Sequence, residues 1–362
     1  MTSGVSMKAI LILEDESIFE GCSFGAKGEK IGKVVFHTGV VGYQELITDP
    51  SYRGLLLTMT YPLIGNYGIN EAGYESEAAQ AEALIVKENS RIHSNWLAQE
   101  SLEDFMKRNN VVGIEGIDTR ALVVHLRDNG EMTGVVSTQD FKIKNLIKKA
   151  KAFSDQERDL ISEVTISKVA VDKPPERIGY KVVVIDLGGT KSLFNSLRNA
   201  GCQIIRVPAR TSAGGILRLN PDGIVLSSGP EDLKGFTQTA GEVRNLLGEK
   251  PVLGISSGNL VLAMALGGEI RKMKCGHHGV NQPVRNLETR KVAITVQNHS
   301  CVVSEGSAKK TDIEVTERNL NDQSIEGIKS KSYPAIGLQY VPADFNMFFA
   351  QMEKELCPKE QI

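Results

Sequence analysis

Several features that mark specialised proteins are scarce in this sequence. Its 362 residues include five cysteines, an odd number without CxxC or mixed Cys/His ligand spacing. This usage predicts neither a disulfide framework nor a structural zinc site, and it favours a reducing compartment. With 42 basic and 44 acidic residues the net charge is -2, so the basic excess that nucleic-acid binding requires is missing.

Long apolar runs are missing as well. No run approaches the ~20 residues that a membrane-spanning helix needs, and the N-terminus lacks the basic and then apolar pattern of a secretory signal. We therefore predict a soluble, cytoplasmic protein that binds neither nucleic acid nor membrane. The length suits two domains, each with a core of its own.

Histidine is scarce where a catalytic base would be useful, because none of the six histidines follows His299. The stretch Gly254–Gly258, with Ser256 at its centre, follows an apolar strand and precedes an apolar helix. Such a sharp strand-to-helix turn holds the nucleophile of many α/β enzymes, and a serine there passes its proton to a histidine. The pattern therefore predicts a nucleophile elbow without its usual general base.

The rest of the pattern predicts two domains of different construction. Up to residue 150, short β-rich runs alternate with turns and are followed by helices. Ser101 and Asp140 are expected to cap two of them, and another is expected to start near Asp118. Residues 151–178 lack sustained periodicity and are predicted to be a connector. From residue 179 onward strands alternate with helices, which indicates a mostly parallel sheet with helices on both faces.

In such a sheet the site lies beyond the carboxyl ends of the strands. The turns Ser227–Pro230 and Ser256–Gly258 both follow strands and are predicted to converge there. A serine-hydrolase mechanism would need Ser256 to be activated by His299, expected at a strand end, or by His278. The adjacent His277 and His278 are expected in an exposed turn, and they cannot share a metal because neighbours in an extended chain point to opposite faces. No metal site is predicted.

Several longer stretches are specific enough to indicate a family. In the first domain they are Gly42–Tyr52, Thr60–Gly68 and Gly116–Leu122, and in the second Leu226–Pro230, the Ser256 turn, Asn281–Val284, Gln297–His299 and Asn319–Asp322. Together they resemble the small, amidotransferase-type subunit of carbamoyl phosphate synthetase over essentially the whole chain. The resemblance implies an N-terminal mixed α/β docking domain over residues 1–150, the connector 151–178, and a class I glutaminase-like, doubly wound parallel sheet over residues 179–362.

The resemblance also implies a partner. A large synthetase subunit is expected to join this chain in a heterodimer or a higher assembly, with a product that feeds arginine or pyrimidine biosynthesis. ATP and Mg are expected on that large subunit, and no cofactor is expected in this chain.

The implied catalytic positions have changed. In the family the elbow carries a cysteine whose thiolate attacks the glutamine amide, and a His-Pro-Glu run near the C-terminus supplies the base and its orienting carboxylate. The resemblance places these three roles at Ser256, Val341 and Ala343. A serine hydroxyl has no useful anion fraction at neutral pH without a base, and valine cannot accept a proton. Gly229 and Asn298 are retained and are the candidate substrate-binding residues.

The implied substrate pocket has changed too. The second glycine of the family's Gly-Pro-Gly turn is Glu231 here, and the Gly-Phe pair after Asn-His is Ser300–Cys301. Some ammonia-using members of the family also carry serine and asparagine at the positions of Ser256 and Asn259.

Three functions fit these observations. The leading hypothesis is a carbamoyl phosphate synthetase small-subunit homologue without glutaminase activity, which supports an ammonia-using large subunit. The second is an amidase or esterase that uses Ser256 with His299 or His278. The third is a paralogue that binds a metabolite without turning it over.

Overall fold

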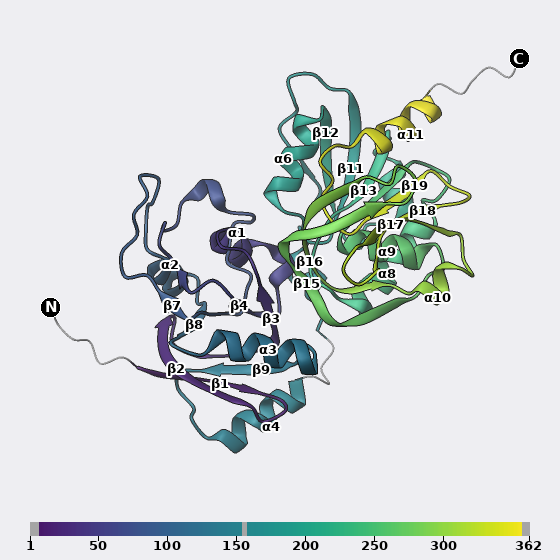
Figure 1. The fold of residues 1–362 in the computed structure, drawn as a ribbon. Helices are drawn as coiled ribbons and strands as arrows, with labels where there is room; N and C mark the ends of the chain where they lie inside the picture. The colour runs from purple at the N-terminus through teal and green to yellow at the C-terminus, as the bar shows by residue number, and fades with distance from the viewer. Residues whose placement is uncertain (1–6, 154–157, 357–362) are drawn as a thin grey trace, which may run out of the picture. The chain divides into compact units, whose positions relative to one another are not determined.

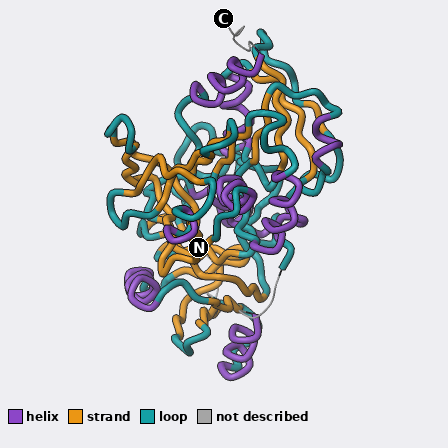
Figure 2. The backbone as a smooth tube through the Cα atoms, turned by 90° about the vertical axis from the view of Figure 1, so that its right-hand side faces the viewer, coloured by secondary structure: helices purple, strands orange, loops and turns teal. Residues whose placement is uncertain are grey.

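The computed structural model describes residues 7–153 and 158–356, which form two compact units. Unit 1 comprises residues up to Arg158 together with Lys274–Gly279, and unit 2 comprises Asp159–Met273 and the chain from Val280 onward. Four residues of the predicted connector, 154–157, and Cys357 lie outside the described residues. Figure 2 shows both units as mixtures of strands and helices.

Unit 1 is built on a closed barrel whose strands form partly parallel and partly antiparallel pairs. In hydrogen-bonding order the strands are β1 (Lys8–Leu13), β2 (Ile18–Gly25), β8 (Val112–Glu115), β6 (Ala83–Ile85), β4 (Leu55–Met59), β3 (Glu29–His37) and β9 (Thr133–Ser137). Side chains on alternating strand positions, such as Leu11 and Leu13, form one core, and Ile10 and Ile12 on the other face form a second. This period of two is the expected geometry of a strand buried on both faces.

Helices and short strands surround this barrel (Figure 1). They are α1 (Tyr43–Thr48), η1 (Pro50–Tyr52), β5 (Leu63–Ile64), η2 (Glu71–Gly73), β7 (Glu88–Asn89), α2 (Leu102–Arg108), α3 (Thr119–Asn129) and α4 (Ile143–Phe153). As predicted, the Ser101 side chain caps α2 and a helix starts near Asp118. The Asp118 side chain also caps that helix, α3, by accepting an N–H group of its first turn. Asp140 accepts the N–H of Lys142 just before α4 begins.

Unit 2 contains a ten-stranded sheet, in the order β10-β12-β11-β13-β14-β19-β18-β17-β15-β16. The strands are β10 (Ala170–Val171), β11 (Tyr180–Asp186), β12 (Cys202–Pro208), β13 (Gly223–Leu226), β14 (Val252–Ile255), β15 (Ile270–Asn286), β16 (Val292–Val303), β17 (Ile313–Asn319), β18 (Ile325–Ser330) and β19 (Ala335–Leu338). The five neighbouring strands β12, β11, β13, β14 and β19 are parallel to one another. Strand β18 pairs with β19 in the antiparallel direction, and β17 pairs with β18 in the same way.

Helices cover both faces of the parallel part. They are α5 (Leu160–Val164), α6 (Lys191–Asn199), α7 (Ala213–Leu217), α8 (Leu233–Arg244), α9 (Ser257–Ala265), α10 (Glu305–Ala308) and α11 (Asn346–Leu356). Side chains of α8 and α9, such as Phe236 and Val261, form the core on one face. Those of α6 and α11, such as Leu193 and Phe348, form the core on the other. This is the doubly wound arrangement that the alternating pattern predicts.

Two local predictions are wrong. His277 and His278 are buried within β15 and do not lie in an exposed turn. His278 Nε2 lies 3.1 Å from Glu131 Oε1, so a buried carboxylate satisfies this imidazole. His299 lies inside β16 and not at its end. Among the described residues, no helix is long and apolar enough to cross a membrane.

Candidate functional site

The turn between β14 and α9 has the backbone geometry of a nucleophile elbow. Ser256, at its tip, has φ 53° and ψ -114°, in a region that residues with a side chain rarely adopt. Its N–H donates to the carbonyl of Leu338 at the end of β19, with a distance of 2.7 Å. The adjacent strand therefore holds the turn in place, and Ser256 is buried, with 9% of the residue exposed.

Three glycines allow the elbow to form because no side chain would fit at their positions. A Cβ on Gly258 would lie 2.2 Å from the carbonyl oxygen of Leu226, and one on Gly254 would lie 2.5 Å from that of Gly258. A Cβ on Gly229 would approach the carbonyl oxygen of Leu187 to 2.0 Å. The turns after β13 and β14 are thus packed backbone against backbone, as the sequence predicts for two turns that converge. The Ser257 hydroxyl joins them by donating to the Gly229 carbonyl at 2.5 Å.

Ser256 Oγ forms no hydrogen bond with any of the described residues, including every imidazole among them. His299, 2% exposed, has Nδ1 3.1 Å from the carbonyl of Cys301 and Nε2 3.0 Å from Gln297 Oε1. Its two ring nitrogens therefore face acceptors on its own strand. His278, the other candidate base, is hydrogen-bonded to Glu131. Within unit 2, the structure does not bring His299 into hydrogen-bond contact with the serine, and His278 belongs to unit 1.

The positions of the implied base and orienting carboxylate follow β19. Val341 is 40% exposed, and Ala343 is exposed as well. Neither side chain has an atom that can take up a proton or accept a hydrogen bond. Just before them, the Tyr340 hydroxyl donates to Glu317 Oε2 at 2.6 Å, which anchors the start of this segment to β17.

The two retained candidate binding residues lie on different elements. Gly229 is buried in the turn after β13, where its carbonyl accepts a hydrogen bond from the Ser257 hydroxyl. Asn298 is half-buried on β16, between Gln297 and His299. Both belong to unit 2.

A series of hydrogen bonds between buried amide side chains, which the sequence does not predict, lies beside the elbow. Asn259 Nδ2 donates to Gln339 Oε1 at 2.5 Å, and Gln339 Nε2 donates to the carbonyl of Cys301 at 3.1 Å. These buried amides connect α9, the end of β19 and β16. The only signal in the sequence is that Asn259 and Gln339 interrupt apolar stretches, since a buried amide needs partners.

The carboxylate of Glu231 has an unexpected role. Its Oε1 accepts the backbone N–H groups of both Ser300, at 2.8 Å, and Cys301, at 2.6 Å. Glu231 therefore joins the turn after β13 to β16. The family resemblance implies a glycine at the position of Glu231, but the two donors are distant in the sequence.

A doubly wound parallel sheet with a strained elbow after a central strand is the fold of an α/β protein with a nucleophile-elbow site. Residues 183–343 match the family described as class-I glutamine amidotransferase, and residues 11–136 match the carbamoyl-phosphate synthase small chain, CPSase domain. The predicted fold class is confirmed.

Curated relatives extend the match over nearly the whole chain. A carbamoyl phosphate synthase small chain from Syntrophotalea carbinolica is 45% identical over 93% of this chain and 93% of its own length. One from Aquifex aeolicus is 43% identical over 92% of this chain and 93% of its own. A pyrimidine-specific small chain from Bacillus subtilis is 41% identical, over 93% and 91%. The chain belongs to the carbamoyl phosphate synthase small chain family, which confirms the predicted resemblance.

Proposed function

We propose that this chain is a small subunit that does not hydrolyse glutamine and that acts as a structural and regulatory partner of an ammonia-using large subunit. The large subunit would make carbamoyl phosphate from ammonia, bicarbonate and ATP, and it would carry the ATP and Mg. The observation that carries the proposal is the isolated hydroxyl of Ser256. It occupies the implied nucleophile position without a hydrogen bond to any described imidazole.

The chemistry of the elbow supports this proposal. A hydroxyl becomes a useful nucleophile only when a neighbouring base takes its proton. At the implied base position Val341 has a hydrocarbon side chain, and Ala343 leaves no carboxylate behind it. In hydrolases that use such a triad, removing its members lowers kcat by roughly ten-thousand-fold to a million-fold. A loss of this size would leave no physiologically useful hydrolysis.

The retained structure supports a role as a partner. Unit 1 is a complete barrel with apolar cores, and the signature stretches Gly42–Tyr52 and Gly116–Leu122 lie in it. The family's name as a small chain implies a large chain beside it. The product would feed arginine or pyrimidine biosynthesis, and one of the relatives is named as pyrimidine-specific.

The source of nitrogen in carbamoyl phosphate tests the proposal. The chain would be produced together with its large subunit, and the purified complex supplied with bicarbonate, ATP, Mg and either amide-¹⁵N glutamine or ¹⁵N ammonium. We expect ¹⁵N in the product only from ammonium. Transfer from glutamine that disappears in Ser256→Ala would contradict the proposal, and failure of the two chains to co-purify would contradict the partner role.

The serine-hydrolase alternative is separable from this proposal. The strained elbow would favour it, but it requires an activated Ser256. A fluorophosphonate probe labels activated serines, so we expect no labelling that depends on Ser256. Labelling of the unaltered chain that Ser256→Ala abolishes would favour an amidase or esterase.

A further inference from the structure

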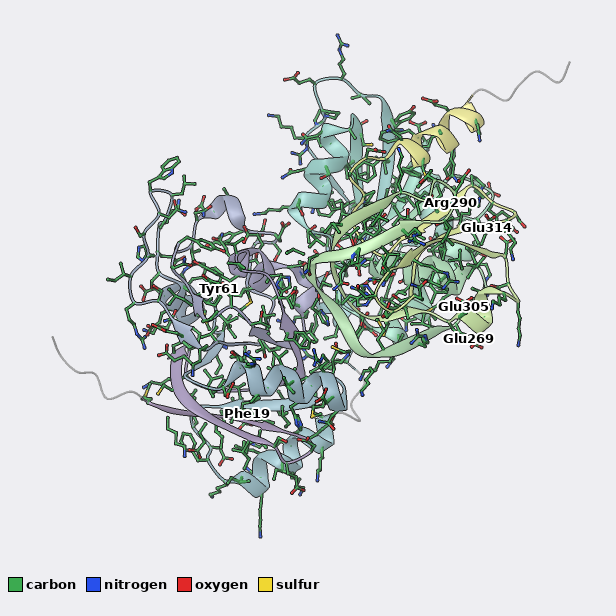
Figure 3. The ribbon with its side chains drawn as sticks, in the orientation of Figure 1. Phe19, Tyr61, Glu269, Arg290, Glu305 and Glu314 are labelled. Atoms are coloured by element: carbon green, nitrogen blue, oxygen red, sulfur yellow. The ribbon has the colours of Figure 1, made fainter. Side chains whose placement is uncertain are left out.

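Strand β16 forms one end of the ten-stranded sheet of unit 2, and its outer edge is open. It spans Val292–Val303, follows the turn that contains Arg290 (Figure 3), and among the described residues has β15 as its one hydrogen-bonded neighbour. The strand at the other end of the sheet, β10, has only two residues. Proteins usually shorten an edge strand or place charged residues or proline on it, because an open edge pairs with other chains. β16 contains no proline, lysine, arginine, aspartate or glutamate.

Hydrogen bonds at the start of the β15–β16 hairpin show which backbone groups of β16 face the open edge. The N–H of Asn286 on β15 donates to the carbonyl of Lys291 at 3.0 Å. The next residue, Leu287, donates instead to the carbonyl of Thr316 on β17 at 2.8 Å. Along a strand the direction of these groups alternates from residue to residue, so every second residue after Lys291 also faces β15. The residues whose N–H and C=O groups face the open edge are therefore Val292, Ile294 and Val296.

The same three residues carry exposed apolar side chains. Val292, Ile294 and Val296 are 49%, 66% and 63% exposed, whereas the intervening Thr295 is buried. We call these three residues the edge stripe. The edge stripe has the same order of side chains from either end, with a valine on each side of the isoleucine. A two-fold axis through Ile294 would therefore place valine opposite valine and isoleucine opposite isoleucine, as a self-complementary interface between identical chains requires.

We propose that β16 pairs with β16 of a second copy of this chain, in the antiparallel direction and centred on Ile294. In this register Val292 lies opposite Val296 of the second copy, and each facing pair of the edge stripe exchanges two N–H···O=C bonds. Facing β-branched side chains stabilise the pairing further. The contact is small, so we expect a weak dimer with a Kd of roughly 10–100 µM.

The flanking charges are compatible with this register. Lys291, the charged residue next to the edge stripe, would lie opposite the uncharged Gln297 of the second copy, so the pairing brings no like charges together. The symmetry of the edge stripe favours a second copy over an unrelated strand, because a single register satisfies both chains equally. This interaction surface goes beyond the proposed function and does not depend on it.

The association of the purified full chain tests the pairing. Sedimentation equilibrium over about 1–500 µM should show a monomer that converts to a dimer as the concentration rises. Amide hydrogen exchange should report the register. Exchange at Val292, Ile294 and Val296 should slow as the dimer forms, whereas exchange at Ala293 and Thr295, whose N–H groups face β15, should be slow at every concentration.

Charges on the edge stripe test the partner and the register together. A chain with Val292→Lys and Val296→Lys should stay monomeric, because lysine would lie opposite lysine, and a chain with Val292→Glu and Val296→Glu should behave in the same way. An equimolar mixture of the two should form a heterodimer with a Kd at least about tenfold lower than that of either alone, because each lysine then faces a glutamate.

Two further variants complete the experiment. Ile92→Lys changes an exposed isoleucine of unit 1 and is the matched control, so it should leave the dimer unchanged. Ile294→Pro removes one N–H that faces the open edge and leaves the bonds to β15 in place, as proline on an edge strand can do. It should abolish dimerisation even if the doubly charged chains do not fold.

A chain that stays monomeric up to the highest concentration would overturn the proposal, as would a dimer that the charged variants leave unchanged. Slow exchange at the edge stripe in the dilute monomer would show that another segment of the same chain covers it. Slow exchange only in the complex with the large subunit would assign the edge to that subunit. Either result contradicts pairing between copies. None of these readouts involves glutamine, so their failure would leave the proposed function untouched.

Discussion

At the scale of single residues, Ser256 adopts a strained backbone conformation that no hydrogen bond of its hydroxyl offsets. Its φ of 53° is sterically unfavourable for a side chain, and its hydroxyl has no hydrogen-bond partner among the described residues. Strain of this kind costs on the order of 1–3 kcal/mol and persists at sites where it serves a function. In an active enzyme the elbow would present the nucleophile. Here we infer that the strain is a remnant of that role.

Replacing this residue by glycine should therefore stabilise unit 2. Ser256→Gly relieves the strain but adds freedom to the unfolded chain, so we expect the free energy of unfolding to rise by about 1 kcal/mol. The midpoint of denaturant unfolding measures this change in the free energy of unfolding. Ser257→Gly is the matched control and should destabilise, because it removes the hydroxyl bonded to Gly229. An unchanged or lower midpoint for Ser256→Gly would show that the serine contributes contacts of its own.

A buried histidine in unit 1 should make that unit sensitive to acid. Burial and then the nearby charge of His278 lower the pKa of His37 from 6.5 to about 4, and His37 Nδ1 accepts the N–H of Gly39 at 3.0 Å. The unfolded chain then binds the proton more readily than the folded one. Stability should fall by about 3 kcal/mol as the pH drops from 6.5 to 4.

The variant His37→Asn keeps an acceptor for Gly39 and removes the titrating group, so thermal unfolding should lose this pH dependence. The exposed His93→Asn is the control and should keep it. Glu131 does not account for this pH window. Burial raises the pKa of its carboxyl, but the bonds to His278 and Lys33 outweigh burial and hold that pKa well below 4.5. The contribution of Glu131 to the free energy of unfolding is therefore present above pH 4.5 and is lost only in stronger acid. Equal slopes for His37→Asn and the unaltered chain between pH 6.5 and pH 4.5 would contradict the assignment.

At the scale of elements, the elbow exists because two turns meet without side chains between them. Gly258→Ala would place a Cβ 2.2 Å from the carbonyl of Leu226, so the turns after β13 and β14 would have to separate. We expect destabilisation of about 3 kcal/mol, at the upper end for overpacking. Melting of the variant measures this effect.

Gly241, on α8, offers a matched contrast. A Cβ there meets nothing within 4 Å, and the residue lies within a helix. Gly241→Ala should therefore stabilise by about 0.5–1 kcal/mol. Similar melting temperatures for the two alanine variants would refute the claim that backbone contact shapes the elbow.

The sequence predicts helix starts and turns well where residues close to the boundary determine them. The caps at Ser101 and Asp118 and the elbow at Ser256 follow from side chains within a few residues of each boundary. The failures involve distant partners. The burial of His278 depends on Glu131, and the role of Glu231 depends on Ser300 and Cys301, which no local pattern connects.

At the scale of the whole molecule, the family was predictable from signature stretches, whereas the short elements between residues 151 and 178 were not. Residues 151–178 were predicted to be a connector, but α5 (Leu160–Val164) and β10 (Ala170–Val171) lie within them and belong to unit 2. Both elements are short. Their placement depends on contacts with the rest of the unit, such as the Thr165 hydroxyl bond to the Asp186 carbonyl, and not on periodicity.

If the proposed function holds, glutaminase activity should require changes beyond the three implied catalytic positions. Ser256→Cys, Val341→His and Ala343→Glu together should release little ammonia from glutamine, because Glu231 still holds the N–H groups of Ser300 and Cys301. Adding Glu231→Gly should raise the rate at least tenfold, that is, by about 1.4 kcal/mol of barrier. The same changes with Ser256 retained are the control. Full activity of the triple variant would show that Glu231 does not obstruct the site.

The most direct test of the central claim is ammonia release from glutamine by the purified chain, alone and with its large subunit, compared with Ser256→Ala. We expect ammonia release by both proteins to match the background without protein, because under the proposed function no base takes the proton of the Ser256 hydroxyl. Turnover by the unaltered chain that Ser256→Ala abolishes would contradict it.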